Sequence, residues 1–190
     1  KKYLFTTFLI LLTLPSVFGQ YRIVYNVAKD SKNDDYEVYS MNVDGSDKRN
    51  ITNHKDVAWT YYAYKGRLFF VSDRDACKRC YALYEMDAMG NNVKKLSDLR
   101  LEDSWMGTRN NGSEMVVSGR IGNETRYQLF IIDLKTGKYR QLTDEKEAAF
   151  RDPSFSPGGK HISYVYKKQR TNREEYEDLW IMDADGSNRR

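Results

Sequence analysis

The sequence has few of the residues from which catalytic and metal sites are most often built. Its two histidines, His54 and His161, are isolated from each other, whereas a structural zinc site needs four ligands. It has no G-x-S-x-G segment, no phosphate-binding loop and no dinucleotide fingerprint. We therefore expect no catalytic residue, no metal and no cofactor within these 190 residues.

Charge of one sign and long apolar runs are also scarce. The 31 basic and 27 acidic side chains give a net charge of +4 and form no dense Lys/Arg stripe, so nucleic acid is not an expected partner. A single stretch near the N-terminus is apolar enough to enter a bilayer, which excludes a polytopic membrane protein. Aromatic residues make up 14% of the chain, which excludes an intrinsically disordered protein.

The first 19 residues, KKYLFTTFLILLTLPSVFG, have the layout of a secretory signal peptide. Two lysines precede an apolar run from Tyr3 to Leu14, and Pro15 and small residues lead to a cut near Gly19. The run is short for a membrane span, although an uncleaved N-terminal anchor is the alternative. We expect a periplasmic or secreted protein, without stable membrane insertion after cleavage, whose mature part is 20–190.

The two cysteines, Cys77 and Cys80, lie close together in the run DACKRCY. An oxidising compartment permits a disulfide between them. A dithiol redox site is the functional alternative, but that chemistry usually needs a helix N-terminus to lower the thiol pKa, and no helix is predicted here. We therefore expect a local loop clip or two unpaired thiols.

The mature part of the chain is a repeat. Each unit has an aromatic residue, an Asn or Asp, a turn with Gly and a basic stretch, and three units then close with an apolar residue and Ser or Thr. The four segments are YSMNVDGSDKRNIT (39–52), YEMDAMGNNVKKLS (84–97), FIIDLKTGKYRQLT (130–143) and WIMDADGSNRR (180–190). Their Asn or Asp positions are separated by 45, 46 and 50 residues.

A second apolar segment precedes each of these. The four are YRIVYN (21–26), GRLFFVS (66–72), GSEMVVSG (112–119) and GKHISYVY (159–166). Such short, aromatic-rich runs bounded by turns favour strands over helices. A unit of about 45 residues with four strands is one blade of a β-propeller, and neighbouring blades stack to bury their faces.

The Asp-Gly turns have two interpretations. Asp44-Gly45 and Asp185-Gly186 suit tight hairpins, which need a positive φ. Asp183, Asp185 and Asn188 also have the spacing that starts a calcium loop, but the further oxygen ligands of such a loop are missing. We expect hairpin turns in every blade.

The run F-S-P-x-G-K, followed by an apolar strand and then L-W-I-M-D-x-D-G, resembles the TolB-like β-propeller repeat. That family includes the periplasmic TolB protein and the propeller domains of prolyl-oligopeptidase-type enzymes. The resemblance covers 20–190 and is best in 150–190, whereas Tyr62-Ala63-Tyr64-Lys65-Gly66 replaces the signature in the second unit.

The resemblance implies an all-β propeller of four-stranded antiparallel blades. About four blades would be present, as a truncated part of a six-bladed ring that is incomplete at the C-terminus, where the last blade would lack its outer strand. A four-bladed ring closed by pairing of the two chain ends is the alternative.

Residues just ahead of each inner strand should lie near one mouth of the central channel. They are Asp56, Trp59, Glu102, Asp103, Trp105, Arg151 and Asp152. A mixed ring of acids and tryptophans could hold a peptide segment of a partner, since aromatic and Arg side chains are enriched at interface hot spots. The alternative is that both tryptophans pack between blades and the acids cap turns.

Together these expectations describe an exported, non-catalytic propeller that binds a protein or peptide in the cell envelope. The main rival is the N-terminal propeller of a peptidase or other hydrolase whose catalytic domain lies beyond residue 190, where the blades would act as a gate or specificity domain. Fold alone does not separate the two.

Overall fold

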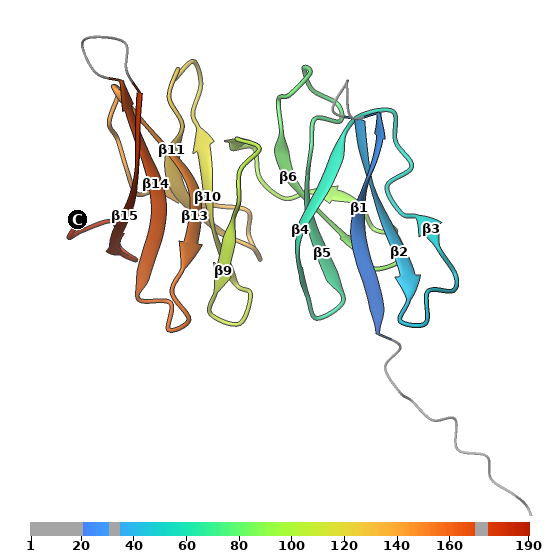
Figure 1. Cartoon of the computed structure of the whole chain (residues 1–190). Coiled ribbons are helices and arrows are strands. Elements are labelled where there is room, and N and C mark those ends of the chain that lie inside the picture. The colour runs from blue at the N-terminus through green and yellow to red at the C-terminus, as the bar shows by residue number, and fades with distance from the viewer. Residues whose placement is uncertain (1–20, 31–34, 170–174) are drawn as a thin grey trace, which may run out of the picture.

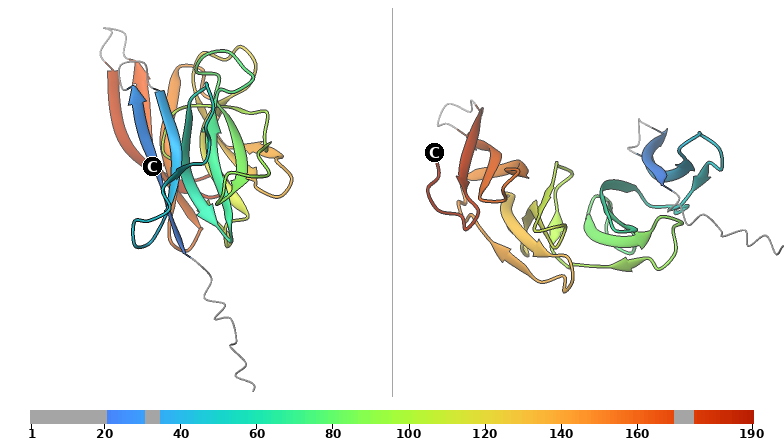
Figure 2. Two further views of the ribbon diagram at one scale, coloured as in Figure 1. Left: turned by 90° about the vertical axis from the view of Figure 1, so that its right-hand side faces the viewer. Right: turned by 90° about the horizontal axis from the view of Figure 1, so that it is seen from below.

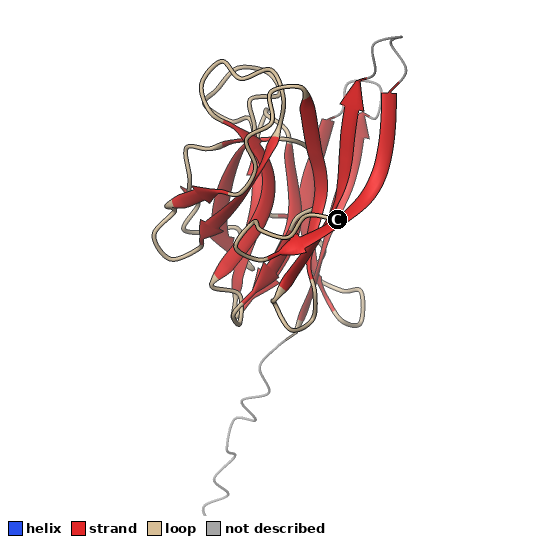
Figure 3. Ribbon diagram, turned by 90° about the vertical axis from the view of Figure 1, so that its left-hand side faces the viewer, coloured by secondary structure: helices blue, strands red, loops and turns tan. Residues whose placement is uncertain are grey.

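The computed structural model describes residues 21–30, 35–169 and 175–190, and the predicted signal peptide at 1–19 lies outside the described residues. Within these ranges every regular element is a β-strand (Figure 3). None of the described segments forms a helix long and apolar enough to cross a membrane. The all-β prediction is confirmed.

The described strands form four antiparallel sheets, which we call blades 1 to 4 in chain order. Blade 1 holds β1 (Arg22–Asp30), β2 (Asp35–Asn42) and β3 (Arg49–Asn50). Blade 2 holds β4 (Ala58–Tyr64), β5 (Arg67–Ser72), β6 (Ala82–Asp87) and β7 (Lys94–Lys95). Blade 3 holds β8 (Arg100–Leu101), β9 (Gly107–Arg109), β10 (Glu114–Arg120), β11 (Gln128–Asp133) and β12 (Tyr139–Gln141). Blade 4 holds β13 (Ala148–Phe155), β14 (His161–Gln169) and β15 (Glu175–Asp183).

The blades follow one another along an open arc (Figure 1; Figure 2, right). Strands β4, β9 and β13 line its concave side, and β7 and β12 lie toward the convex side. Blades 1 and 4 are not paired with each other, so the described chain is an arc of four blades and not a closed four-bladed ring.

Among the described residues, blade 4 holds three strands and lacks an outer strand, as expected, although its last residue already pairs where such a strand would begin. The backbone of Arg190 exchanges two hydrogen bonds with Ile181, of 2.9 and 3.0 Å. The same register joins Arg49 to Ser40 in blade 1.

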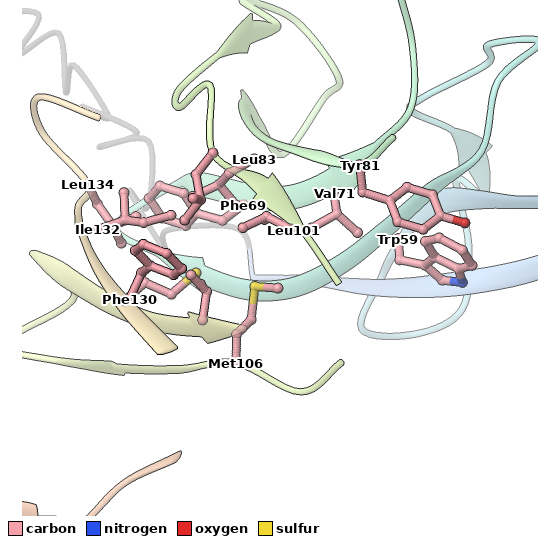
Figure 4. Packing of buried hydrophobic residues seen from close by; sticks show 13 residues of the cluster. Trp59, Phe69, Val71, Tyr81, Leu83, Leu101, Met106, Phe130, Ile132 and Leu134 are labelled. Carbon is pink, nitrogen blue, oxygen red and sulfur yellow. The ribbon is translucent and has the colours of Figure 1, made fainter. Parts of the chain in front are cut away.

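Three hydrophobic clusters fill the spaces between successive blades. In β10, Met115 and Val117 pack toward blade 2, whereas Val116 packs toward blade 4. Successive side chains of a strand point to opposite faces, so a strand covered on both faces reads as an unbroken apolar run. Figure 4 shows the cluster between blades 2 and 3, where Phe69 and Leu83 meet Phe130 and Ile132. Burial between blades therefore explains the continuous runs LFFV and LFII.

The repeated glycine turn packs against the end of the outer strand of the preceding blade. Gly137, in the turn between β11 and β12, has a φ of +74°, and a Cβ at this position would overlap the carbonyl oxygen of Leu96. A Cβ at Gly90 would likewise overlap the carbonyl oxygen of Ile51, and one at Gly186 would stand in tight contact, 3.0 Å from the carbonyl oxygen of Leu142. Each of these partners is the apolar residue that closes the preceding repeat.

Two glycine substitutions distinguish the effect of this close contact on stability from the cost of a left-handed backbone conformation. Gly45 has a φ of +81°, but a Cβ added there would have nothing within 4 Å, so Gly45→Ala should cost about 1–2 kcal/mol for the left-handed backbone alone. Gly137→Ala should cost about 1–3 kcal/mol more, because the new methyl group forces the blades apart. Urea unfolding of both variants measures the difference, and equal losses would contradict a contact that constrains blade stacking.

Candidate functional site

The inner strands are irregular on the concave side of the arc. The pairing of β4 with β5 shifts between Thr60 and Tyr62, and that of β13 with β14 shifts between Arg151 and Ser154. In blade 3 the inner position is split between β8 and β9, which both pair with β10. Such breaks leave residues outside the regular ladder and re-aim their side chains.

The predicted site residues occupy three kinds of position. Glu102, Asp103 and Trp105 lie in the break between β8 and β9, and Asp56 precedes β4 as expected. Trp59 lies within β4, and Arg151 and Asp152 lie within β13. The expectation that these last three precede the inner strands was wrong, because those strands begin earlier and continue through a bulge.

Four of the predicted residues meet at the boundary of blades 3 and 4, and we call Glu102, Trp105, Arg151 and Asp152 the inner cluster. Glu102 Oε1 lies 3.0 Å from Arg151 Nε, an ion pair in which the N–H does not point at the oxygen. The backbone N–H of Trp105 donates a hydrogen bond of 2.9 Å to Asp152 Oδ1. Asp152 has a φ of +49° at the bulge of β13. A break in one blade is thus tied to a bulge in the next.

The carboxyl group of Glu102 is largely buried. Burial raises its pKa above the ordinary value, and the positive charge of Arg151 opposes that shift. Glu102 Oε2 also lies 3.0 Å from the hydroxyl of Ser118 on β10. Sequence reasoning missed the contact of Ser118 with Glu102. The only sign of it in the sequence is that a hydroxyl side chain follows the apolar run MVV.

The two tryptophans have opposite environments. Trp59 is 9% exposed, and its ring lies 5.2 Å from that of Tyr36 and 5.1 Å from that of Tyr81, between centroids. It lies at one end of the cluster in Figure 4 and stabilises packing, as the alternative interpretation expected. Trp105 is 60% exposed and presents its indole at the surface.

The other two predicted residues take different places. Asp103 is exposed in the break between β8 and β9. The carboxylate of Asp56 lies 3.3 Å from His54 Nδ1, in the loop before β4, and not in the inner cluster.

The loop between β5 and β6 is closed by a disulfide between Cys77 and Cys80, whose Cα atoms are 5.1 Å apart. The carboxylate of Asp73 anchors the same loop by accepting hydrogen bonds from the backbone N–H groups of Arg79 (2.8 Å) and Val57 (3.1 Å). The loop-clip interpretation therefore applies. In the described part of the chain, no three His, Cys, Asp or Glu side chains gather into a group that could hold a metal ion.

Solved structures share this fold. TolB from Acinetobacter baumannii aligns with a TM-score of 0.62 at 23% identity, over 90% of this chain and 40% of that protein. A puromycin-hydrolysing peptidase from Mycobacterium tuberculosis aligns with a TM-score of 0.67 at 13% identity, over 89% of this chain and 26% of the peptidase. An oligogalacturonate lyase in complex with manganese aligns with a TM-score of 0.66 at 14% identity, over 89% of this chain and 48% of the lyase.

These likenesses confirm the TolB-like propeller fold expected from the repeat. No family model matches the chain, and no curated protein matches it in sequence. The chain spans less than half the length of each of these three proteins.

The raised pKa of Glu102 predicts a pH dependence of stability. A carboxyl group whose folded-state pKa lies above its unfolded value of 4.5 contributes stability below that value, and the contribution is lost as the pH rises through the folded pKa. Glu102→Gln cannot ionise, so its free energy of unfolding relative to the native chain should increase from about pH 4 to about pH 7.

Urea unfolding across this pH range tests the prediction. The exposed side chain of Glu147 offers a matched control, and Glu147→Gln should follow the native chain. A relative stability of Glu102→Gln that falls with rising pH would show that the ion pair with Arg151 outweighs burial.

Proposed function

We propose that this TolB-like propeller is an exported, non-catalytic scaffold that binds a protein or peptide segment in the cell envelope. The binding surface is the inner cluster on the concave side of the blades. The observation that carries the proposal is the exposure of Trp105. This residue is 60% exposed, although its backbone N–H is hydrogen-bonded to Asp152 of the next blade.

The arrangement fits an interface hot spot. Tryptophan and arginine are the side chains most enriched at such spots, and Trp105 and Arg151 stand on adjacent blades. The backbone N–H of Trp105 is hydrogen-bonded to Asp152, so this segment is already ordered before a partner binds. The entropic cost of binding is therefore lower. Glu102 and Arg151 supply charges of both signs that orient a polar segment.

The envelope location rests on the sequence of residues 1–19. A basic start, a short apolar run and small residues at the end are typical of an export signal. The disulfide between Cys77 and Cys80 agrees with an oxidising compartment.

A second candidate function is the propeller domain of a hydrolase. It is favoured by the likeness to the puromycin-hydrolysing peptidase, of which this chain covers 26%. In that case catalytic residues lie outside residues 1–190, and the inner cluster selects or admits the substrate of the neighbouring domain.

Substitution of Trp105 tests the scaffold proposal. The native chain, immobilised, is used to capture a partner from an envelope fraction, and the captured protein is then titrated against purified variants. Trp105→Ala should weaken this interaction by about thirtyfold or more, the effect of a hot-spot tryptophan. Its free energy of unfolding should change by less than about 1 kcal/mol, because the side chain is exposed.

Val43→Ala is the matched control, since Val43 is 67% exposed in the turn of blade 1, outside the inner cluster. It should bind as the native chain does. Equal affinity of the Trp105→Ala and Val43→Ala variants would overturn the assignment of the inner cluster as the binding surface.

A further inference from the structure

A cavity of about 480 Å³ lies at blade 2, and none of its lining residues belongs to the inner cluster. Its wall comes from the disulfide loop between β5 and β6, from β6 and β7, and from the segment that leads into β8. His54, in the link from blade 1 to blade 2, completes the wall. The volume is in the range of pockets that bind small molecules.

A buried arginine lines this cavity. Arg74 is 7% exposed, and its guanidinium lies over the rings of Phe70 at 5.0 Å and Tyr84 at 5.5 Å. Its Nε donates a hydrogen bond to the hydroxyl of Ser72, but Nη2 has no hydrogen-bond partner. Within the described ranges no carboxylate forms an ion pair with Arg74. Burying a cation with an unsatisfied N–H donor costs folding free energy unless a hydrogen-bond acceptor pairs with that donor.

The surrounding charge is positive. Arg100 lines the same cavity, and its buried Nε also has no hydrogen-bond partner. Lys94 and Lys95 stand beside it, each in an ion pair with an acid, Glu85 and Asp98. The wall also carries the carboxylate of Asp75, whose charge acts on Arg74 without forming an ion pair with it, so the basic side chains of the wall still outnumber the acidic ones.

The position of Arg74 is fixed by its loop. The hydroxyl of Tyr84 donates a hydrogen bond of 3.0 Å to the carbonyl oxygen of Arg74. The carboxylate of the neighbouring Asp73 joins the loop to itself at Arg79 and to the segment before β4 at Val57, and the disulfide between Cys77 and Cys80 closes the loop. A guanidinium held in this way loses little freedom when a ligand binds.

We infer that this cavity is a binding site for an oxyanion, a carboxylate or phosphate group, held by the guanidinium of Arg74, with Arg100 as a second basic side chain of the wall. The planar fork of an arginine matches two oxygens of such a group. Burial lowers the pKa of Arg74, and a bound negative charge would offset the cost of keeping this side chain ionised. The site shares no residue with the inner cluster and does not require its proposed partner.

Calorimetric titration tests the inference. Sodium phosphate and sodium succinate serve as probes of the two groups, at an ionic strength held constant with sodium chloride. The native chain should bind at least one of them saturably, and the comparison shows which group the cavity prefers. Arg74→Gln should weaken binding by about tenfold or more, because a charge-assisted bidentate contact is lost.

Two further variants guard against a folding defect and against a general effect of charge. Arg100→Gln should also weaken binding, and the unfolding curve of each variant shows whether it is folded. Arg190→Gln removes an exposed guanidinium from blade 4 and should bind as the native chain does. The inference is overturned if neither anion binds saturably, if folded Arg74→Gln and Arg100→Gln retain native affinity, or if Arg190→Gln weakens binding equally.

Discussion

Each blade after the first packs against the preceding blade through a close backbone contact at a turn glycine. The turn glycine approaches the carbonyl of the residue that closes the outer strand of the preceding blade, as Gly137 does at Leu96. The residues that end a repeat also complete its own sheet, since Thr143 Oγ1 accepts a hydrogen bond of 2.9 Å from the N–H of Leu129. The apolar residue and the Ser or Thr that close a repeat therefore complete the outer edge of their own blade and also form the surface on which the next blade packs.

This stacking determines where functional side chains can lie. The middle strands of the central blades are covered on both faces by neighbouring blades, so they carry apolar residues and offer little chemistry. Polar and exposed side chains collect where the ladder is interrupted. The break between β8 and β9 holds Glu102 and Trp105, and the loop between β5 and β6 holds Arg74. Stacking of the blades holds both groups of side chains on the same frame.

Sequence reasoning located the blades better than it located the sites. The spacing of the Gly turns and apolar runs predicted the four sheets, since hairpin geometry and strand period are local properties. It grouped Trp59 with Trp105 because they hold similar places in the repeat. Their environments differ because the rings of Tyr36 and Tyr81 enclose Trp59, whereas Trp105 stands in a strand break. Arg74 gave no signal, because a charged residue beside a loop usually faces water.

The sequence by itself determined the all-β class, the length of the repeat, the hairpin turns and the place of the two cysteines in one short loop. These follow from local conformational preference and from the periodicity of apolar residues. The tertiary structure decided that the blades form an open arc, that Glu102 meets Arg151 across a blade boundary, and that Arg74 is buried against Phe70 and Tyr84. Burial and charge pairing depend on residues distant in the chain, and stacking of the blades is what brings those residues together.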